Sequence, residues 1–135
     1  MKSSIPEVLS SLIGLKCCDA KLGCDNYLAL KFGDSIKIEE EWGFETKACL
    51  WRITDNEKLL CGSGDESSYI NDFIKNLIEL KLISVQRISN NDIVFVFKEG
   101  YEIQLFSQSK DKECFTVIPP NRGKITFSSA GGWLE

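Results

Sequence analysis

Histidine, the side chain that most often serves as a general base or a metal ligand, is missing from this 135-residue chain. Without it, neither a Ser-His-Asp triad nor a Cys-His pair can form, so the common nucleophilic hydrolase mechanisms are excluded. The six cysteines contain no C-x-x-C spacing, which argues against a zinc knuckle and a thioredoxin-like motif. We therefore expect no metal and no cofactor, with a cluster of thiols assembled by the fold as the alternative.

Carboxylates are the remaining groups that could do chemistry, and the chain has 20 of them. The densest run is Glu39-Glu40-Glu41. Glycoside hydrolysis needs two carboxyl groups that face each other across a cleft. On a strand, however, Glu39 and Glu41 would share one exposed face with Lys37. A solvated strand face and an acidic partner-binding patch are therefore favoured over catalysis.

Trp42 directly follows this acidic run. An aromatic residue beside charges is typical of an interface anchor, although it could equally cap the core. Charge reversal at Glu39 and Glu41 is expected to slow association with a basic partner at low salt. The hypothetical partner-binding site comprises Glu39, Glu41, Trp42, Asp65 and Glu66.

The segment Gly62-Ser63-Gly64 is similar to part of a phosphate-binding loop. It lacks the G-x-x-x-x-G-K-[ST] spacing, and no lysine follows its second glycine. The pattern therefore favours a flexible connection between a strand and a helix over residues 62–65.

The overall composition is that of an ordinary soluble protein, with 43% hydrophobic residues, 27% charged residues and a formal net charge of −4. The length fits a single domain over residues 1–135. The absence of a basic cluster argues against nucleic-acid binding. No apolar run reaches the roughly 18 residues that cross a bilayer, and the N-terminal segment lacks the apolar core of a signal peptide. We expect a cytoplasmic protein with reduced cysteines and no membrane contact.

Two helices are expected. Ser4 and Glu7 can form a capping box, and Gly14 can end a helix of about two turns. Its apolar face would hold Val8, Leu9, Leu12 and Ile13.

The second helix is central and amphipathic, with Ser67 or Ser68 as its cap. Its apolar residues recur at i, i+3, i+4, i+7 and i+8, which is the stripe of a helix that packs on a core. They are Ile70, Phe73, Ile74, Leu77 and Ile78.

About eight strands follow from period-two alternation and short apolar runs, and the short turns between them favour antiparallel pairing. The run at residues 48–53 is apolar up to Arg52, which predicts a central strand buried on both sides with Trp51 in the core. Gly43 is expected at a turn or a bulge. The fold class is therefore α+β, with a mainly antiparallel sheet and the central helix on one face. The expected strands are residues 27–32, 36–41, 48–53, 59–61, 82–88, 93–97, 101–106, 114–118 and an edge strand at 124–127.

Three phrases together resemble a known group of proteins. They are NYLALKFG at residues 26–33, CLWRI at 49–53 and NDIVFVF at 91–97, followed by Gly100 and by Leu105-Phe106. They are similar to small bacterial immunity proteins found beside polymorphic toxins, including those of contact-dependent growth inhibition systems. The resemblance implies a cytoplasmic protein that binds one cognate toxin and blocks its active site.

The leading hypothesis is therefore an immunity protein, which needs no catalytic residue. Many such toxins are nucleases with basic surfaces, and an acidic inhibitor would complement them. The alternative is a small-molecule or peptide-binding module with an apolar pocket between sheet and helix. A third possibility is an enzyme that uses carboxylates or a thiol without histidine.

Overall fold

The computed structural model of the chain describes residues 7–33, 40–47, 49–88, 92–107, 113–120 and 125–128. These residues form ten strands and two α-helices, with 3-10 turns between them, and the strands pair antiparallel. The predicted α+β class is confirmed. In chain order the elements are α1 (Glu7–Ser10), β1 (Cys17–Leu22), η1 (Cys24–Asn26), β2 (Leu28–Phe32), β3 (Trp42–Thr46), β4 (Cys49–Asp55), β5 (Lys58–Gly62), α2 (Ser67–Ile74), η3 (Lys75–Leu77), β6 (Leu82–Arg87), β7 (Ile93–Phe97), η4 (Lys98–Gly100), β8 (Tyr101–Ser107), β9 (Glu113–Ile118) and β10 (Ile125–Ser128).

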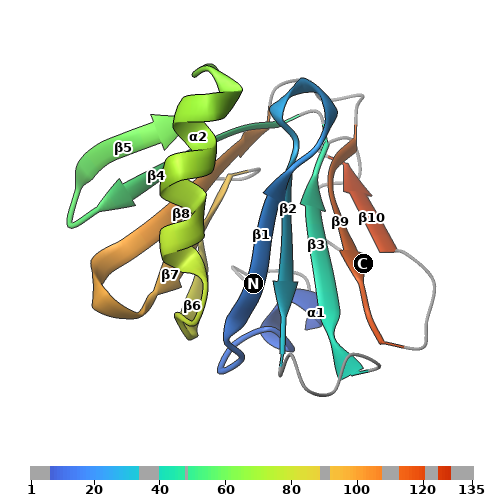
Figure 1. Ribbon diagram of the computed structural model, residues 1–135. Helices are drawn as coiled ribbons and strands as arrows, with labels where there is room; N and C mark the ends of the chain where they lie inside the picture. The colour runs from blue at the N-terminus through green and yellow to red at the C-terminus, as the bar shows by residue number, and fades with distance from the viewer. Residues whose placement is uncertain are drawn as a thin grey trace.

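The strands divide into two five-stranded sheets. The first sheet has the order β1-β2-β3-β9-β10, and the second has the order β5-β4-β8-β7-β6. Figure 1 shows the second sheet on the left and the first sheet on the right. The sequence pattern predicts a single sheet, whereas the strands form two.

Two strands that follow each other closely in the chain belong to different sheets. β3 ends at Thr46 and pairs with β9 in the first sheet, and β4 begins at Cys49 and pairs with β8 in the second. Lys47 extends the pairing with β9 by one residue, because its N–H donates to the carbonyl oxygen of Cys114 at 2.7 Å. A bridge between Lys16 and Lys81 connects the start of β1 to the start of β6. Main-chain hydrogen bonds therefore hold the two sheets together at this point.

A shared apolar core fills the space between the sheets. Phe44 of the first sheet lies 4.8 Å from Phe95 of the second, measured between ring centroids, and Phe32 lies 6.2 Å from Phe97. All four side chains are buried in one cluster. Because burying a side chain of this size contributes roughly 1.5–3 kcal/mol, the two inner faces stabilise each other.

The central helix closes the gap between two sheet edges rather than covering a sheet face. α2 packs against β1 and β5, the edge strands of the first and second sheets, and Figure 1 shows it in front of this opening. Its apolar stripe is confirmed, although the α-helix ends at Ile74, so that Leu77 lies in the 3-10 turn η3 and Ile78 follows it. Ile70, Ile74 and Leu77 are fully buried, and Phe73 and Ile78 are partly buried.

The start of α2 differs from the prediction. Glu66 occupies the N-cap position, and no side chain makes a cap hydrogen bond there, so the predicted cap by Ser67 or Ser68 is wrong. Ser67 instead donates its hydroxyl to Oδ1 of Asn26 at 2.7 Å. A neighbouring turn, rather than a local cap, fixes the start of this helix.

The N-terminal helix is shorter than predicted. α1 is a single turn that ends at Ser10, so Gly14 does not end the helix as predicted. It closes the following turn, in the left-handed conformation with φ +95°. Leu9 and Leu12 are fully buried, but Ile13 is 40% exposed, so the apolar face is narrower than expected. The predicted cap Ser4 and most of the strand predicted at 36–41 lie outside the described residues.

Two strands were not anticipated where they occur. β1 contains Asp19 and Lys21 and has no β-branched residue, so its strand propensity is low. Gly43 lies inside β3 rather than at a turn or a bulge, and it pairs with Ile118. A Cβ at Gly43 would lie 3.2 Å from Cδ1 of Ile118, so the glycine leaves room for that side chain.

Candidate functional site

The outer face of the second sheet is exposed to solvent around β4. Along this strand Trp51 and Ile53 point into the core, whereas Leu50 and Arg52 are exposed. The predicted central position of the strand is confirmed, and so is the burial of Trp51. The predicted burial on both sides is wrong. Leu50 is 50% exposed, and Leu59 on the neighbouring β5 is 59% exposed.

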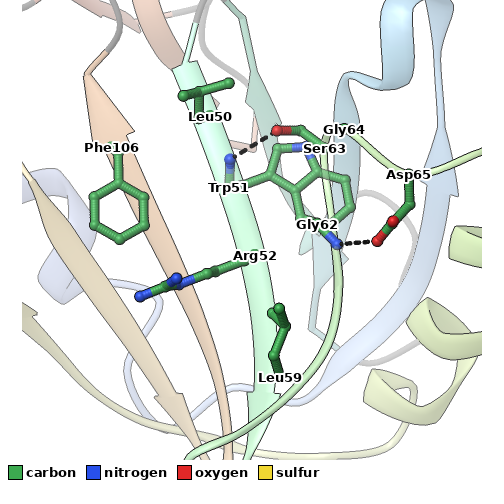
Figure 2. Close-up of a pocket in the computed structure, with 9 residues that line it drawn as sticks. All are labelled: Leu50, Trp51, Arg52, Leu59, Gly62, Ser63, Gly64, Asp65 and Phe106. Atoms are coloured by element: carbon green, nitrogen blue, oxygen red, sulfur yellow. Dashed lines mark hydrogen bonds between the residues drawn. The ribbon is translucent and has the colours of Figure 1, made fainter.

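A pocket of about 350 Å³ opens on this face (Figure 2). Leu50, Leu59 and Phe106 line one part of it, and residues 62–65 line another. Gly62 pairs with Arg52, so no side chain fills the space beside that arginine on β5. A Cβ at this glycine would lie 3.1 Å from the carbonyl oxygen of Trp51 and 3.3 Å from Cβ of Arg52. The glycine therefore creates the hollow.

Arg52 is held in place beside the pocket. Its Cζ atom lies 5.2 Å from the ring centroid of Phe106, and its Nε donates a hydrogen bond to Oε1 of Gln104. Figure 2 shows the guanidinium group reaching below the aromatic ring. Stacking on an aromatic face stabilises the cation and limits its conformations. We call Leu50, Arg52, Leu59 and Phe106 the outer-face cluster.

Residues 62–65 lead from β5 to α2, as predicted, and hydrogen bonds close a turn within them. The N–H of Gly62 donates to Oδ2 of Asp65 at 2.9 Å, and the N–H of Asp65 donates to the Gly62 carbonyl at 3.0 Å. Ser63 donates its N–H to the Trp51 carbonyl at 2.8 Å and accepts the Trp51 N–H at its hydroxyl at 3.2 Å. The N–H and the carbonyl of Gly62 are thus both hydrogen-bonded within the turn. They are therefore not free to pair with a strand that another chain might add at the edge formed by β5.

Asn26 holds this turn from the side of β1. Its Nδ2 donates to the carbonyls of Ser63 at 3.2 Å and Asp65 at 2.8 Å. Its main-chain carbonyl accepts the indole N–H of Trp51 at 3.0 Å. Asn26 has φ +57°, a left-handed conformation that asparagine tolerates better than most residues. The turn after β1 therefore fixes one wall of the pocket.

Glu41, one of the predicted partner-binding residues, is mostly buried. Its side chain is 13% exposed, with Oε1 4.0 Å from Nζ of Lys31 and Oε2 accepting the Cys18 thiol at 3.6 Å. Glu40 and Glu41 precede β3 and do not belong to a strand. The expectation of an exposed strand face is therefore wrong for Glu41, and Glu39 lies outside the described residues.

The other predicted residues lie apart from this position. Trp42 begins β3 and packs partly buried against the core. Asp65 and Glu66 are exposed in the connection between β5 and α2. Glu41 contacts the start of β1, whereas Asp65 contacts Asn26, just past the end of β1. The two parts of the predicted site thus lie at opposite ends of one strand.

The six cysteines are free thiols. Burial raises the pKa of Cys17 and of Cys49 to about 12 and that of Cys61 to about 11. Burial, followed by the neighbouring Glu41 carboxylate, also raises the pKa of Cys18. These four thiols therefore stay protonated at neutral pH and are weak nucleophiles. In the part of the chain that the structure describes, no three cysteine, aspartate or glutamate side chains gather to hold a metal ion.

A second hollow, of about 500 Å³, lies near the start of β1. Lys16, Cys18, Glu79 and Lys81 are among its lining residues, and Lys16 forms an exposed ion pair with Glu79 at 3.5 Å. Exposed pairs of this kind contribute little to binding or stability. The thiol in this hollow, that of Cys18, stays protonated and is a weak nucleophile. We therefore take the outer-face cluster as the candidate site.

The outer-face cluster was missed at the level of sequence. The run at 49–53 looks apolar throughout, because Leu50 lies beside Trp51. The available signal was Arg52, which shares a strand face with Leu50 two residues away. An arginine on one face of a strand indicates that the leucine two residues before it also faces outward.

Within the described residues, the helices are all too short to cross a membrane. Comparison with known proteins adds no relative, since no family model, no curated protein and no solved structure matches the chain.

Proposed function

We propose that the chain is a bacterial immunity protein that binds a cognate toxin domain through the outer-face cluster and occludes its active site. The observation that carries this proposal is the pair of exposed leucines beside an arginine stacked on Phe106. Binding energy at protein interfaces concentrates in a few arginine and aromatic anchors within a well-packed apolar surround. A fixed arginine and a hydrogen-bonded turn also limit the entropy lost on binding.

The choice of a toxin as the partner rests on the resemblance of the three strand phrases to immunity proteins. The net charge of −4 supports it, because an acidic protein associates faster with a basic partner such as a nuclease. Occlusion needs only a stable complex, so the inhibitor itself requires no catalytic group.

Co-expression with each toxin domain encoded beside the gene tests this proposal. The wild-type chain should restore growth and co-purify with one toxin, and Leu50→Glu should lose both effects because it places a charge in the contact. Ile83→Glu is the matched control, since Ile83 is also 50% exposed but lies on β6 at the other edge of the sheet. Failure of the wild type against every adjacent toxin would refute the immunity role. Full protection by Leu50→Glu would refute the surface.

A small-molecule or peptide-binding module is the second candidate. The pocket of about 350 Å³ favours it, since ligand sites commonly span about 300–1,000 Å³. The pocket opens on the outer sheet face, not between sheet and helix as the sequence led us to expect. A small molecule that stays on the wild type in native mass spectrometry, and is lost from Leu50→Glu, would favour this function over immunity.

A further inference from the structure

We infer that Arg52 binds a carboxylate of the partner protein, presented next to an apolar side chain that enters the pocket between Leu50 and Leu59. This inference deepens the proposed function and rests on it. It assigns the occupant of the pocket: a segment in which an aspartate or a glutamate adjoins a large apolar residue.

Contacts within the protein use only part of the Arg52 guanidinium group. Its Nε is used by Gln104, and its face is used by the ring of Phe106. Its terminal amino groups form no ion pair with any residue that the structure describes. Arginine carries five N–H donors in a planar fork, so the donors of the terminal amino groups remain for a ligand.

Covering the charge of Arg52 with a partner costs free energy unless a counter-charge is supplied. A partner that buries Leu50 and Leu59 also removes water from Arg52, which lies beside them on the same face. An ionised group that loses its water without gaining a counter-charge is strongly unfavourable. A segment that brings an anion to Arg52 while it packs on the two leucines is therefore favoured over one that does not.

The surroundings of Arg52 favour a carboxylate as the anion. A planar guanidinium group matches a carboxylate in a two-pronged hydrogen-bonded pair. A nucleic acid would bring phosphates, but its binding depends on several cations along one surface. Among the described residues that line the pocket, Arg52 is the only cation, which is fewer than nucleic-acid binding uses. The chemistry of this face therefore favours a protein carboxylate.

A toxin that is basic overall can still carry the required acidic residue. Long-range charge governs how fast two proteins meet, whereas close pairs at the centre of an interface govern how long they stay together. The net charge of −4 and the carboxylate preference of Arg52 thus act at different distances.

The experiment uses a phage-displayed library of random twelve-residue peptides, selected on the immobilised full-length wild-type protein. Selected peptides should contain an aspartate or a glutamate beside a leucine, isoleucine or phenylalanine. Replacing that acid by its amide should weaken binding to the wild type roughly 10- to 100-fold, the range for a hydrogen bond to a charged group. The same replacement should have little effect on binding to Arg52→Gln.

Arg52→Lys and Ile83→Glu complete the design. Arg52→Lys keeps the charge but loses the planar fork, so it should fall between wild type and Arg52→Gln. Ile83→Glu should bind the peptides as the wild type does. Circular dichroism verifies that each variant is folded before binding is measured.

The possible outcomes separate the two proposals. Peptides that need Leu50 but bind Arg52→Gln as tightly as the wild type would overturn the carboxylate inference and leave the binding surface intact. A selection that yields no peptide sensitive to Leu50→Glu would count against both the surface and the inference.

Discussion

At the level of single residues, two buried threonines show how one side-chain type has opposite effects. Thr46 is fully buried, and its hydroxyl oxygen accepts the N–H of Leu28 at 2.8 Å. Thr54 is 5% exposed, and its Oγ1 has no hydrogen-bond partner among the described residues. A buried polar group stabilises a fold when it is paired and destabilises it when it is not.

Replacing each threonine by valine should therefore change stability in different directions. Thr46→Val leaves the Leu28 N–H without a partner and should lower the free energy of unfolding by about 1–3 kcal/mol. Thr54→Val removes an unpaired hydroxyl at nearly constant shape and should leave that free energy unchanged or raise it by about 1 kcal/mol. Urea denaturation of the two variants and the wild type measures both effects. Equal losses in the two variants would contradict the assignment.

At the level of elements, Asn26 joins three segments that are distant in sequence. Its side chain bonds to residues 63, 65 and 67, and its carbonyl bonds to the Trp51 indole. The turn after β1, the strand β4 and the start of α2 therefore share one residue as their junction. The wall of the pocket depends on this junction, because residues 62–65 belong to it.

Asn26→Gly should release this junction while keeping the backbone conformation, since glycine adopts φ near +57° freely. We expect a loss of about 1–3 kcal/mol in the free energy of unfolding, from hydrogen bonds that are only partly shielded from water. Amide exchange at residues 63–67 should also become faster. Asn26→Ala should cost about 1 kcal/mol more, because alanine is strained in this region. Unchanged exchange in Asn26→Gly would show that the turn is held by other contacts.

The elements could be predicted where their pattern is local. The stripe of α2 and the strands β7 and β8 followed directly from apolar periodicity. β1 could not be predicted in the same way, because its aspartate, alanine and lysine are residue types depleted in strands and its register shifts between Cys17 and Asp19. The placement of β3 and β4 in different sheets depends on pairing with β9 and β8, which are distant in sequence, and local sequence carries no record of that register.

The same limit applies to the candidate site. The outer-face cluster combines β4, β5 and β8, and Gly62 creates its hollow only because it pairs with Arg52. Acidic residues drew attention to residues 39–42, yet Glu41 is held between Lys31 and Cys18. Charge density along the chain therefore identified polar residues, but strand register decided which side chains face the solvent.

At the level of the whole molecule, the two sheets should unfold together, because the aromatic contacts Phe44–Phe95 and Phe32–Phe97 cross between them. Buried thiols offer a way to test this. Cys17 lies in the first sheet and is fully buried, whereas Trp51 lies in the second sheet. A change in the ionisation of Cys17 should therefore be visible at Trp51 if the molecule is one cooperative unit.

The sign of the pH effect follows from the raised pKa of Cys17, which is about 12 in the folded state. An unfolded thiol ionises near pH 8.5. The stability that the buried, protonated thiol provides is complete below that pH and is lost as the pH rises toward 12. Between pH 8 and 10, each such thiol should lower the free energy of unfolding by about 1–2 kcal/mol.

Urea unfolding at pH 8 and pH 10, followed by Trp51 fluorescence in a chain with Trp42 and Trp133 replaced by phenylalanine, measures this loss. Cys17→Ala should reduce the loss between the two pH values by about 1–2 kcal/mol, whatever it costs at pH 8. Cys24→Ser, at an exposed turn, is the control for removal of a thiol that is not buried. A second chain, in which Trp51 and Trp133 are replaced and Trp42 is kept, reports on the first sheet. If Cys17→Ala altered the pH dependence at Trp42 in that chain but not at Trp51 in the first, the two sheets would be separate folding units. The same effect at both tryptophans would establish that the shared core couples the two sheets. A destabilising substitution in either sheet would then also destabilise the outer-face cluster.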